Sequence, residues 1–218
     1  FFRPGGHGAL IENLNDLDAD IVFIKNIDNV VPDSRRGLTN HYKMVLGGIC
    51  IDLKSKIDSY LRRLDKGTPS QSELDEMLHF LRTQLCVTNE FADRMSAGEI
   101  ADYLRSKFNR PLRVCGMVRN EGEPGGGPYL VYDPNDETIA PQILELSQID
   151  TTDSHERRIV EKSTHFNPVD LVCAIRDYKG RKFDLPKYVD RMTGFISSKS
   201  VDGRDLVALE LPGLWNGA

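Results

Sequence analysis

Paired cysteines, long apolar runs and an excess of basic charge are all missing from this sequence. The four cysteines are widely spaced and form no CxxC pair, which favours buried thiols in a reducing cytoplasm over a metal or redox role. No apolar run approaches the roughly 20 residues that a membrane-spanning helix needs. The net charge is −5, which argues against a general nucleic-acid binder. We therefore expect a cytoplasmic protein with no nucleic-acid and no membrane partner.

Several catalytic signatures are also absent. The sequence contains neither the GxGxxG dinucleotide pattern nor a Walker A loop. It offers no Ser/His/Asp or Cys/His arrangement, so a nucleophilic side chain is not indicated. There is no internal repeat and no low-complexity segment. The 218 residues are 39% apolar, an ordinary globular composition, and their number suits one domain or one domain with a substantial insert.

The most informative stretch is residues 1–29, in which a glycine-rich turn, a helix and an apolar strand follow one another. Apolar residues at helical spacing predict a short helix over residues 9–17, and Phe1-Phe2 would end a preceding strand. The continuous apolar run at 21–24 predicts a strand buried on both faces, which is typical of a parallel α/β sheet.

This order of elements predicts where a ligand would bind. If the strands are parallel, the turn Gly5–Gly8 and the turn 26–29 (Asn-Ile-Asp-Asn) line the same edge of the sheet. Glycines allow close approach to the backbone, and Asp28 could hold a divalent cation. Each motif also has a simpler interpretation, the first as a tight turn and the second as a turn or helix N-cap.

The segment "GGHGALIENLNDLDADIVFIKNIDN" resembles the part of UDP-sugar pyrophosphorylases that runs from a GHG turn to a strand ending in NIDN. The whole sequence resembles a Bacteroidetes family known as domain of unknown function 4301, a distant relative of the sugar nucleotidyltransferases. That resemblance implies a three-layer α/β/α sandwich with a mixed, mainly parallel sheet, of the nucleotide-diphospho-sugar transferase type. We expect the helical block at about 38–108 to be an insert beside this sheet.

The resemblance also implies roles for individual residues. The GHG turn and its neighbour would bind the nucleotide, Asp28 would bind Mg²⁺, and the later segments 116–131, 163–175 and 206–218 would approach the sugar. The nucleotide-binding candidates are Gly5, Gly6, His7, Gly8 and Asn26, and the substrate-binding candidates are Gly125, Gly126, Asn167 and Glu210. At 168–170 the sequence Pro-Val-Asp replaces the asparagine-rich pattern of the relatives, which puts the sugar contacts in doubt.

The resemblance implies transfer of a nucleotidyl group from a nucleoside triphosphate to a sugar phosphate, with release of pyrophosphate. Asp28, Arg119 and Lys179 are the catalytic candidates, the two cations as phosphate contacts. The glycine-rich phosphate loop and the lysine of such enzymes are missing from these residues. We therefore expect residues 1–218 to be the C-terminal part of a nucleotidyltransferase-like domain, with the rest upstream. A non-catalytic nucleotide- or sugar-binding scaffold and a glycosyltransferase are the alternatives.

The remaining elements follow from periodicity and capping. Helices are predicted over residues 40–65, 72–85 and 96–108, the second capped by Ser72 and the third by Ser96 with Glu99. Strands are predicted over 112–118 and 128–131 as a hairpin, and over 157–161, 168–174 and 206–209, the last after an Asp202-Gly203 turn. Arg119 and the basic segment around Lys179 could equally be solvated surface charges.

Overall fold

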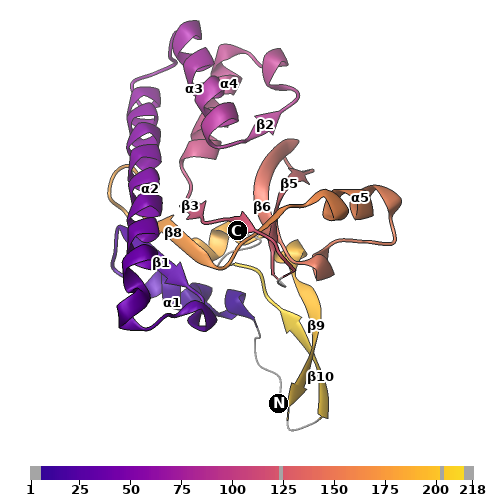
Figure 1. Cartoon of the computed structure of the whole chain (residues 1–218). Coiled ribbons are helices and arrows are strands. Elements are labelled where there is room, and N and C mark those ends of the chain that lie inside the picture. Colours follow the sequence, from indigo (N-terminus) through magenta and orange to yellow (C-terminus); the bar gives the residue numbers. More distant parts are fainter. Residues whose placement is uncertain (1–5, 123–124, 202–203, 214–218) are drawn as a thin grey trace.

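The protein is described by a computed structural model that covers residues 6–122, 125–201 and 204–213 (Figure 1). The expected strand at Phe1-Phe2 and the turn at Asp202-Gly203 lie outside these residues. The helices are α1 (Ile11–Asp16), α2 (Arg36–Leu64), α3 (Gln71–Gln84), α4 (Ala97–Phe108) and α5 (Ser154–Lys162). The strands are β1 (Ile21–Lys25), β2 (Thr88–Asn89), β3 (Leu112–Cys115), β4 (Val118–Arg119), β5 (Gly127–Asp133), β6 (Thr138–Leu144), β7 (His165–Phe166), β8 (Asp170–Ala174), β9 (Phe195–Val201) and β10 (Arg204–Glu210).

The strands form four small sheets in which every pairing within the described residues is antiparallel. The sheet that contains the first strand has the order β1-β8-β3, and the others are β2-β6-β5, β4-β7 and β9-β10. The expected three-layer sandwich around a mainly parallel sheet is therefore wrong. The apolar run at 21–24 does form β1, but β1 pairs with a strand some 145 residues later and leaves Phe23 half-exposed.

β8 is the central strand of its sheet, and its two faces bury side chains in two different clusters. Val172 and Ala174 pack with Cys50 of α2, while Cys173 packs with Leu14 of α1 on the other face. The alternation follows from the pleat of a strand, which sends successive side chains to opposite faces. β8 therefore holds α1 and α2 on opposite sides of one short sheet, as Figure 1 also shows.

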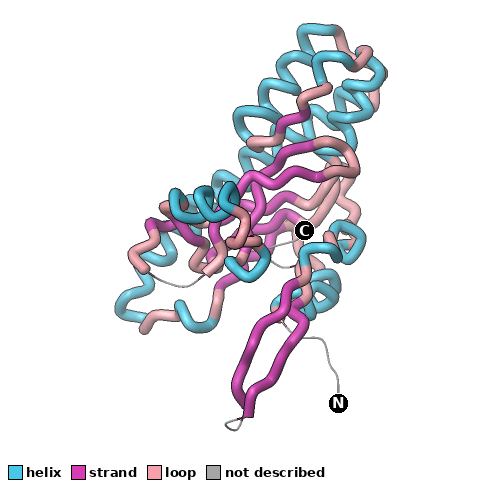
Figure 2. The backbone as a smooth tube through the Cα atoms, turned by 90° about the vertical axis from the view of Figure 1, so that its right-hand side faces the viewer, coloured by secondary structure: helices cyan, strands magenta, loops and turns pink. Residues whose placement is uncertain are grey.

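The predicted helical block forms a cluster at one end of the molecule (Figures 1 and 2). Its core joins the C-terminal half of α2 to α3 and α4, with Tyr60, Phe80 and Phe108 in mutual ring contact. Capping boxes start α3 at Ser70 and α4 at Ser96, so Ser96 is confirmed as the cap and Ser72 is not. None of the described helices is both long and apolar enough to cross a membrane.

Three other predicted elements differ in the structure. The expected hairpin over 112–131 does not form, because β3 pairs with β8 while β5 pairs with β6. Residues 157–161, expected as a strand, lie in α5, whose first turn is capped by the Asp153 side chain at the N–H groups of His155 and Glu156. The run 206–209 is a strand, but it lies in the β9–β10 ribbon with three exposed apolar side chains rather than in a core.

Removing buried volume from the helical cluster should destabilise the protein. Leu104 is fully buried in α4, so Leu104→Ala should lower the unfolding free energy by about 2–5 kcal/mol in urea denaturation. Val207 on the β9–β10 ribbon is 68% exposed, and Val207→Ala should change it by less than about 0.5 kcal/mol. Equal effects of the two substitutions would contradict the described core.

Candidate functional site

The GHG turn packs against the end of β10, and together they form what we call the glycine–histidine junction (residues 6–8 with 210–212). The N–H of Gly8 donates to the carbonyl oxygen of Leu211 at 3.1 Å. A Cβ atom at Gly8 would lie 2.0 Å from the carbonyl oxygen of Pro212, and one at Gly6 would lie 2.1 Å from Oε2 of Glu210. Gly6 also has φ 74, which favours glycine. Both glycines are therefore required by the close approach of the chain itself.

Glu210 brings a carboxylate into this junction. Glu210 is only 5% exposed, and its Oε1 accepts a hydrogen bond of 2.6 Å from the hydroxyl of Ser197 on β9. Burial raises the pKa of nearby Glu145, and the negative charge of Glu210 raises it further. Two carboxyl groups therefore share a poorly solvated region beside the GHG turn.

His7 is the third titratable group of this region, and both of its ring nitrogens are buried. Burial lowers the pKa of His7 to about 4, the charge of Glu210 acts in the opposite direction, and the charge of Arg113 lowers it further. His7 is therefore a neutral imidazole at physiological pH, able to donate one hydrogen bond and accept one. A neutral ring of this kind suits a base or a sugar hydroxyl better than a phosphate.

A second meeting point, the asparagine junction, joins Asn167 to Asn26. Asn167 is 3% exposed; its Nδ2 donates to the carbonyl oxygen of Gly116 at 2.7 Å and its Oδ1 accepts from the N–H of Val169 at 3.0 Å. The N–H of Asn26 donates to the carbonyl oxygen of Val169 at 3.0 Å. Asn167 thus uses its amide to hold the backbone around the NIDN turn.

Gly126 lies between the asparagine junction and Glu145. The N–H of Asn167 donates to the carbonyl oxygen of Gly126 at 2.8 Å. A Cβ atom at Gly126 would lie 2.6 Å from Cγ2 of Ile143 and 3.2 Å from Oε1 of Glu145, so only glycine fits. Its neighbour Gly125 lies against the ring of Phe166. The predicted glycines therefore pack between the carboxyl groups of one junction and the buried amide of the other.

Asp28 lies in the 3₁₀ turn that follows β1 and is exposed, with its N–H 3.4 Å from Oδ1 of Asn26. The neighbouring carboxylate of Asp170 is ion-paired with Lys25 at 2.8 Å and lies 3.9 Å from Lys43. No three His, Cys, Asp or Glu side chains come together as a metal-binding group in residues 6–122, 125–201 and 204–213. In phosphate-handling sites Mg²⁺ is usually bound by one or two carboxylates together with substrate phosphates and water.

The two predicted phosphate contacts lie apart from each other. Arg119 is exposed on β4 and pairs with His165 of β7. His165 lies two residues before Asn167, so Arg119 is close to the asparagine junction along the chain. Lys179 is ion-paired with Asp65 at 3.1 Å and lies over the ring of Tyr178, against the C-terminal end of α2. These contacts place Lys179 beside the helical cluster. Gly5 lies outside the described residues.

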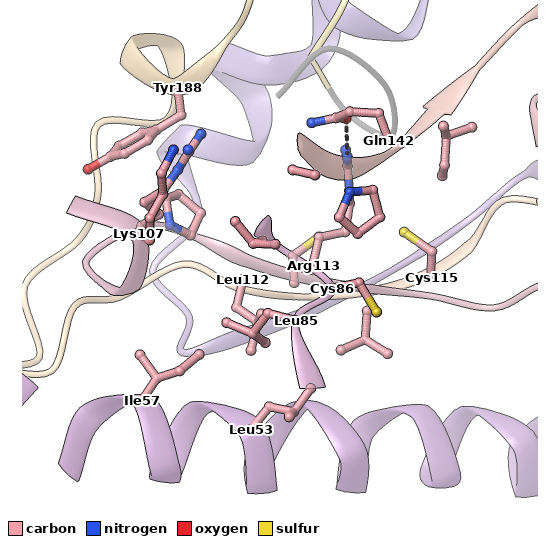
Figure 3. A pocket seen from close by; sticks show the side chains of 18 of the residues that line it. Leu53, Ile57, Leu85, Cys86, Lys107, Leu112, Arg113, Cys115, Gln142 and Tyr188 are labelled. Atoms are coloured by element: carbon pink, nitrogen blue, oxygen red, sulfur yellow. Dashed lines mark hydrogen bonds between the residues drawn. The ribbon is translucent and has the colours of Figure 1, made fainter. Parts of the chain in front are cut away.

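A cavity of about 530 Å³ adjoins the glycine–histidine junction, with Gly213 and Ile11 in its wall. It extends between β3 and β6, where the guanidinium of Arg113 donates to Oε1 of Gln142 at 3.3 Å (Figure 3). Cavities of about 300–1,000 Å³ are typical of small-molecule sites.

Sequence reasoning did not find Arg113, Glu145 or Ser197, although all three surround the predicted histidine and glutamate. They lie on β3, just after β6 and on β9, and no local motif marks them. One signal was available in the sequence. Arg113 interrupts an apolar strand pattern and Glu145 directly follows one, and a charged residue in such a position is a candidate for a buried charge.

The fold and the two junctions define a helical and antiparallel protein in which residues far apart in sequence meet around a buried ionisable cluster. The chain belongs to the family described as Domain of unknown function (DUF4301), whose model matches residues 1–218. Membership of this family confirms that part of the predicted resemblance, while the likeness to UDP-sugar pyrophosphorylases stays a prediction. No match was found among curated proteins or among solved structures.

The glycine–histidine junction can be tested with two glycine-to-alanine substitutions. Gly8→Ala would drive a Cβ atom into backbone carbonyl oxygens and should lower the unfolding free energy by about 1–3 kcal/mol. Gly48 lies in the interior of α2, where an added Cβ atom would meet open space, so Gly48→Ala should raise it by about 0.5–1 kcal/mol. Urea denaturation of both variants measures the two signs, and a neutral or stabilising Gly8→Ala would contradict the junction.

Acid should weaken the fold through His7. Because the pKa of His7 is about 4 in the folded chain and 6.5 ordinarily, the unfolded chain binds a proton first, and stability is lost as the pH falls from about 6.5 towards 4. The loss should reach about 2 kcal/mol at pH 5. His7→Gln should remove this component, as measured by urea denaturation at pH 7 and pH 5. The exposed His79→Gln is the matched control and should keep the wild-type pH dependence; retention of that dependence in His7→Gln would refute the assignment.

Proposed function

We propose that this chain forms the nucleotide- and sugar-facing part of a nucleotidyltransferase that acts on a sugar phosphate and releases pyrophosphate. The reaction is attack of a phosphate oxygen of the sugar phosphate on the α-phosphorus of a nucleoside triphosphate, with pyrophosphate as leaving group. Such chemistry depends on positioning and on neutralising charge, and it needs no nucleophilic side chain.

The observation that supports this proposal is the meeting of segments that resemble the pyrophosphorylases but lie far apart in the chain. The GHG turn touches Glu210, the acidic position of the last such segment, through Gly6 and Gly8. The N–H of Asn26 in the NIDN turn donates a hydrogen bond to the carbonyl oxygen of Val169, whose own N–H donates to the side chain of Asn167. What supports the proposal is the identity of these segments, because each pair of neighbours joins two stretches that resemble the pyrophosphorylases.

Individual side chains then take limited roles. The GHG turn, with His7 as a buried neutral ring, is the candidate for contact with a base or a sugar, and Asp28 with Asn26 forms the exposed polar turn at the other junction. Mg²⁺ enters the proposal only as an ion that arrives with the phosphates and gains one carboxylate from Asp28. Asn167 is buried by its own hydrogen bonds, so its role is to position the neighbouring backbone.

A second candidate is a non-catalytic nucleotide- or sugar-binding scaffold. Two observations favour it: the carbonyl oxygens of Leu211 and Pro212 occupy the space beside Gly8, and Asp28 is a single exposed carboxylate rather than part of a metal-binding cluster among the described residues. A scaffold of this type would bind ligand without turnover.

The proposal is tested by calorimetric titration with each common nucleoside triphosphate in the presence of Mg²⁺, followed by a pyrophosphate-release assay with sugar 1-phosphates. Asp28→Asn should reduce metal-dependent turnover at least tenfold, because it removes the carboxylate near the phosphates. Asp33→Asn alters an equally exposed carboxylate a few residues away and should leave turnover unchanged.

The possible results separate the candidates. Turnover that falls in Asp28→Asn but not in Asp33→Asn supports the enzyme. Binding without pyrophosphate release, unaffected by either substitution, supports the scaffold. Failure of every nucleotide to bind would exclude the enzyme and the nucleotide-binding scaffold, and a titration with sugar phosphates alone would then test the sugar-binding scaffold.

A further inference from the structure

The N-terminal half of α2 carries a line of apolar side chains that is open to solvent. One side of this half is buried: Gly47 lies against the ring of Phe23, and Cys50 packs on β8. Figure 1 shows α2 running along one side of the molecule. Four apolar residues on another side of the helix are between 44% and 68% exposed: Leu38, Tyr42, Val45 and Ile49. A contiguous apolar surface of this kind marks an interaction site.

These four residues follow one another at the spacing of a coiled-coil contact. Positions 38, 42, 45 and 49 are separated by four, three and four residues, which places them along one line of an α-helix. The same alternation reaches one position further at each end, to Arg35 just before the helix and to Asp52 within it. This line, the α2 seam (residues 35, 38, 42, 45, 49 and 52), therefore has an apolar middle and opposite charges at its two ends.

The two end charges of the seam have no counterpart in their own chain. Arg35 and Asp52 are both exposed, and neither forms an ion pair with any residue of the part that the structure describes. The adjacent Arg36, by contrast, is paired with Asp33 at 2.9 Å. Arg35 also lies at the N-terminus of α2, where the helix dipole disfavours a cation. Both end charges are therefore available to groups outside the chain.

A second α2 seam running in the opposite direction matches the first position by position. Position 38 then faces 49 and position 42 faces 45, so the middle of the contact consists of four apolar layers. At each end Arg35 faces the partner's Asp52. A parallel pair would instead set Arg35 against Arg35 and Asp52 against Asp52, and like charges repel. Charge complementarity therefore favours a second copy of this chain in the antiparallel direction.

We propose that two copies of this chain associate through their α2 seams, with the two helices antiparallel. Burial of the apolar layers supplies the free energy of association, and the pairs between Arg35 and the partner's Asp52 set the direction. The seam contains none of the residues assigned to the nucleotide, the sugar or Mg²⁺. The association can therefore hold or fail independently of the proposed function.

Sedimentation equilibrium of the full chain measures the association. At concentrations rising to about 100 μM, the wild-type protein should approach twice the mass of one chain, as expected for a dissociation constant in the micromolar range. A wild-type protein that stays monomeric over this range would overturn the proposal.

Two substitutions on α2 locate the contact. Val45→Glu places a carboxylate in the middle of the seam and should weaken association at least tenfold, because the charge would be buried between the helices. Ile51→Glu introduces the same charge at an exposed apolar position of α2 outside the seam and should leave association unchanged. Both side chains are exposed, so both variants should keep the wild-type circular dichroism spectrum. Equal association of wild type and Val45→Glu, or equal losses in the two variants, would overturn the assignment.

Charge reversal tests the direction of the helices. In Arg35→Glu two carboxylates would face each other at each end of an antiparallel pair, and in Asp52→Arg two guanidinium groups would do so. Each variant alone should therefore self-associate about tenfold more weakly than wild type. An equimolar mixture of the two variants restores both opposite-charge pairs and should recover the wild-type affinity. Single variants that associate like wild type, as a parallel pair requires, or a mixture without recovery would overturn the proposal.

Discussion

The two-sided burial of β8 is the constraint on which the rest of this structure depends. Because β8 lies between β1 and β3, it satisfies its backbone groups on both edges, and because its pleat feeds two separate clusters, it fixes α1 and α2 on opposite faces. The buried amide of Asn167 then sets the path of the chain just before β8 begins. Removal of this strand would separate the GHG turn from the NIDN turn. The GHG turn leads into α1, which packs on β8, and the NIDN turn follows β1, which pairs with β8.

Local elements of the fold were predictable where local chemistry decides them. The capping box at Ser96 and the apolar face of the C-terminal half of α2 needed only short-range spacing, and both are present, whereas Val45 and Ile49 of the same predicted face are exposed. Partner choice was not predictable, because an apolar run such as 21–24 looks the same in a parallel and in an antiparallel sheet. The strand predicted over residues 157–161 was wrong for a related reason. The β-branched pair Ile159-Val160 favours a strand, but the N-cap at Asp153 starts a helix.

For the candidate site, the sequence singled out segments that the structure brings into contact, but it did not give the reason for their composition. The glycines of the GHG turn were expected to admit a ligand, yet in the structure they admit the carbonyl oxygens of Leu211 and Pro212 and the carboxylate of Glu210. Gly6 does lie against Glu210, and Asn26 is hydrogen-bonded to the backbone around Asn167, while the roles that the resemblance implies for these residues stay a prediction. Arg113 and Glu145 were missed because their importance comes from their positions, Arg113 near His7 and Glu145 near Glu210, and position is a property of the fold and not of any motif.

The length of α2 has a mechanical consequence. Its 29 residues span about 44 Å, and they belong to two cores: Cys50 is buried against the sheet, and Leu61 and Leu64 are buried in the helical cluster. A long helix curves gently, and it kinks sharply only at identifiable features such as proline or an inserted side chain. The helical cluster and the β8 sheet are therefore both packed against the same helix, so a change in the direction of its axis would be shared by both cores.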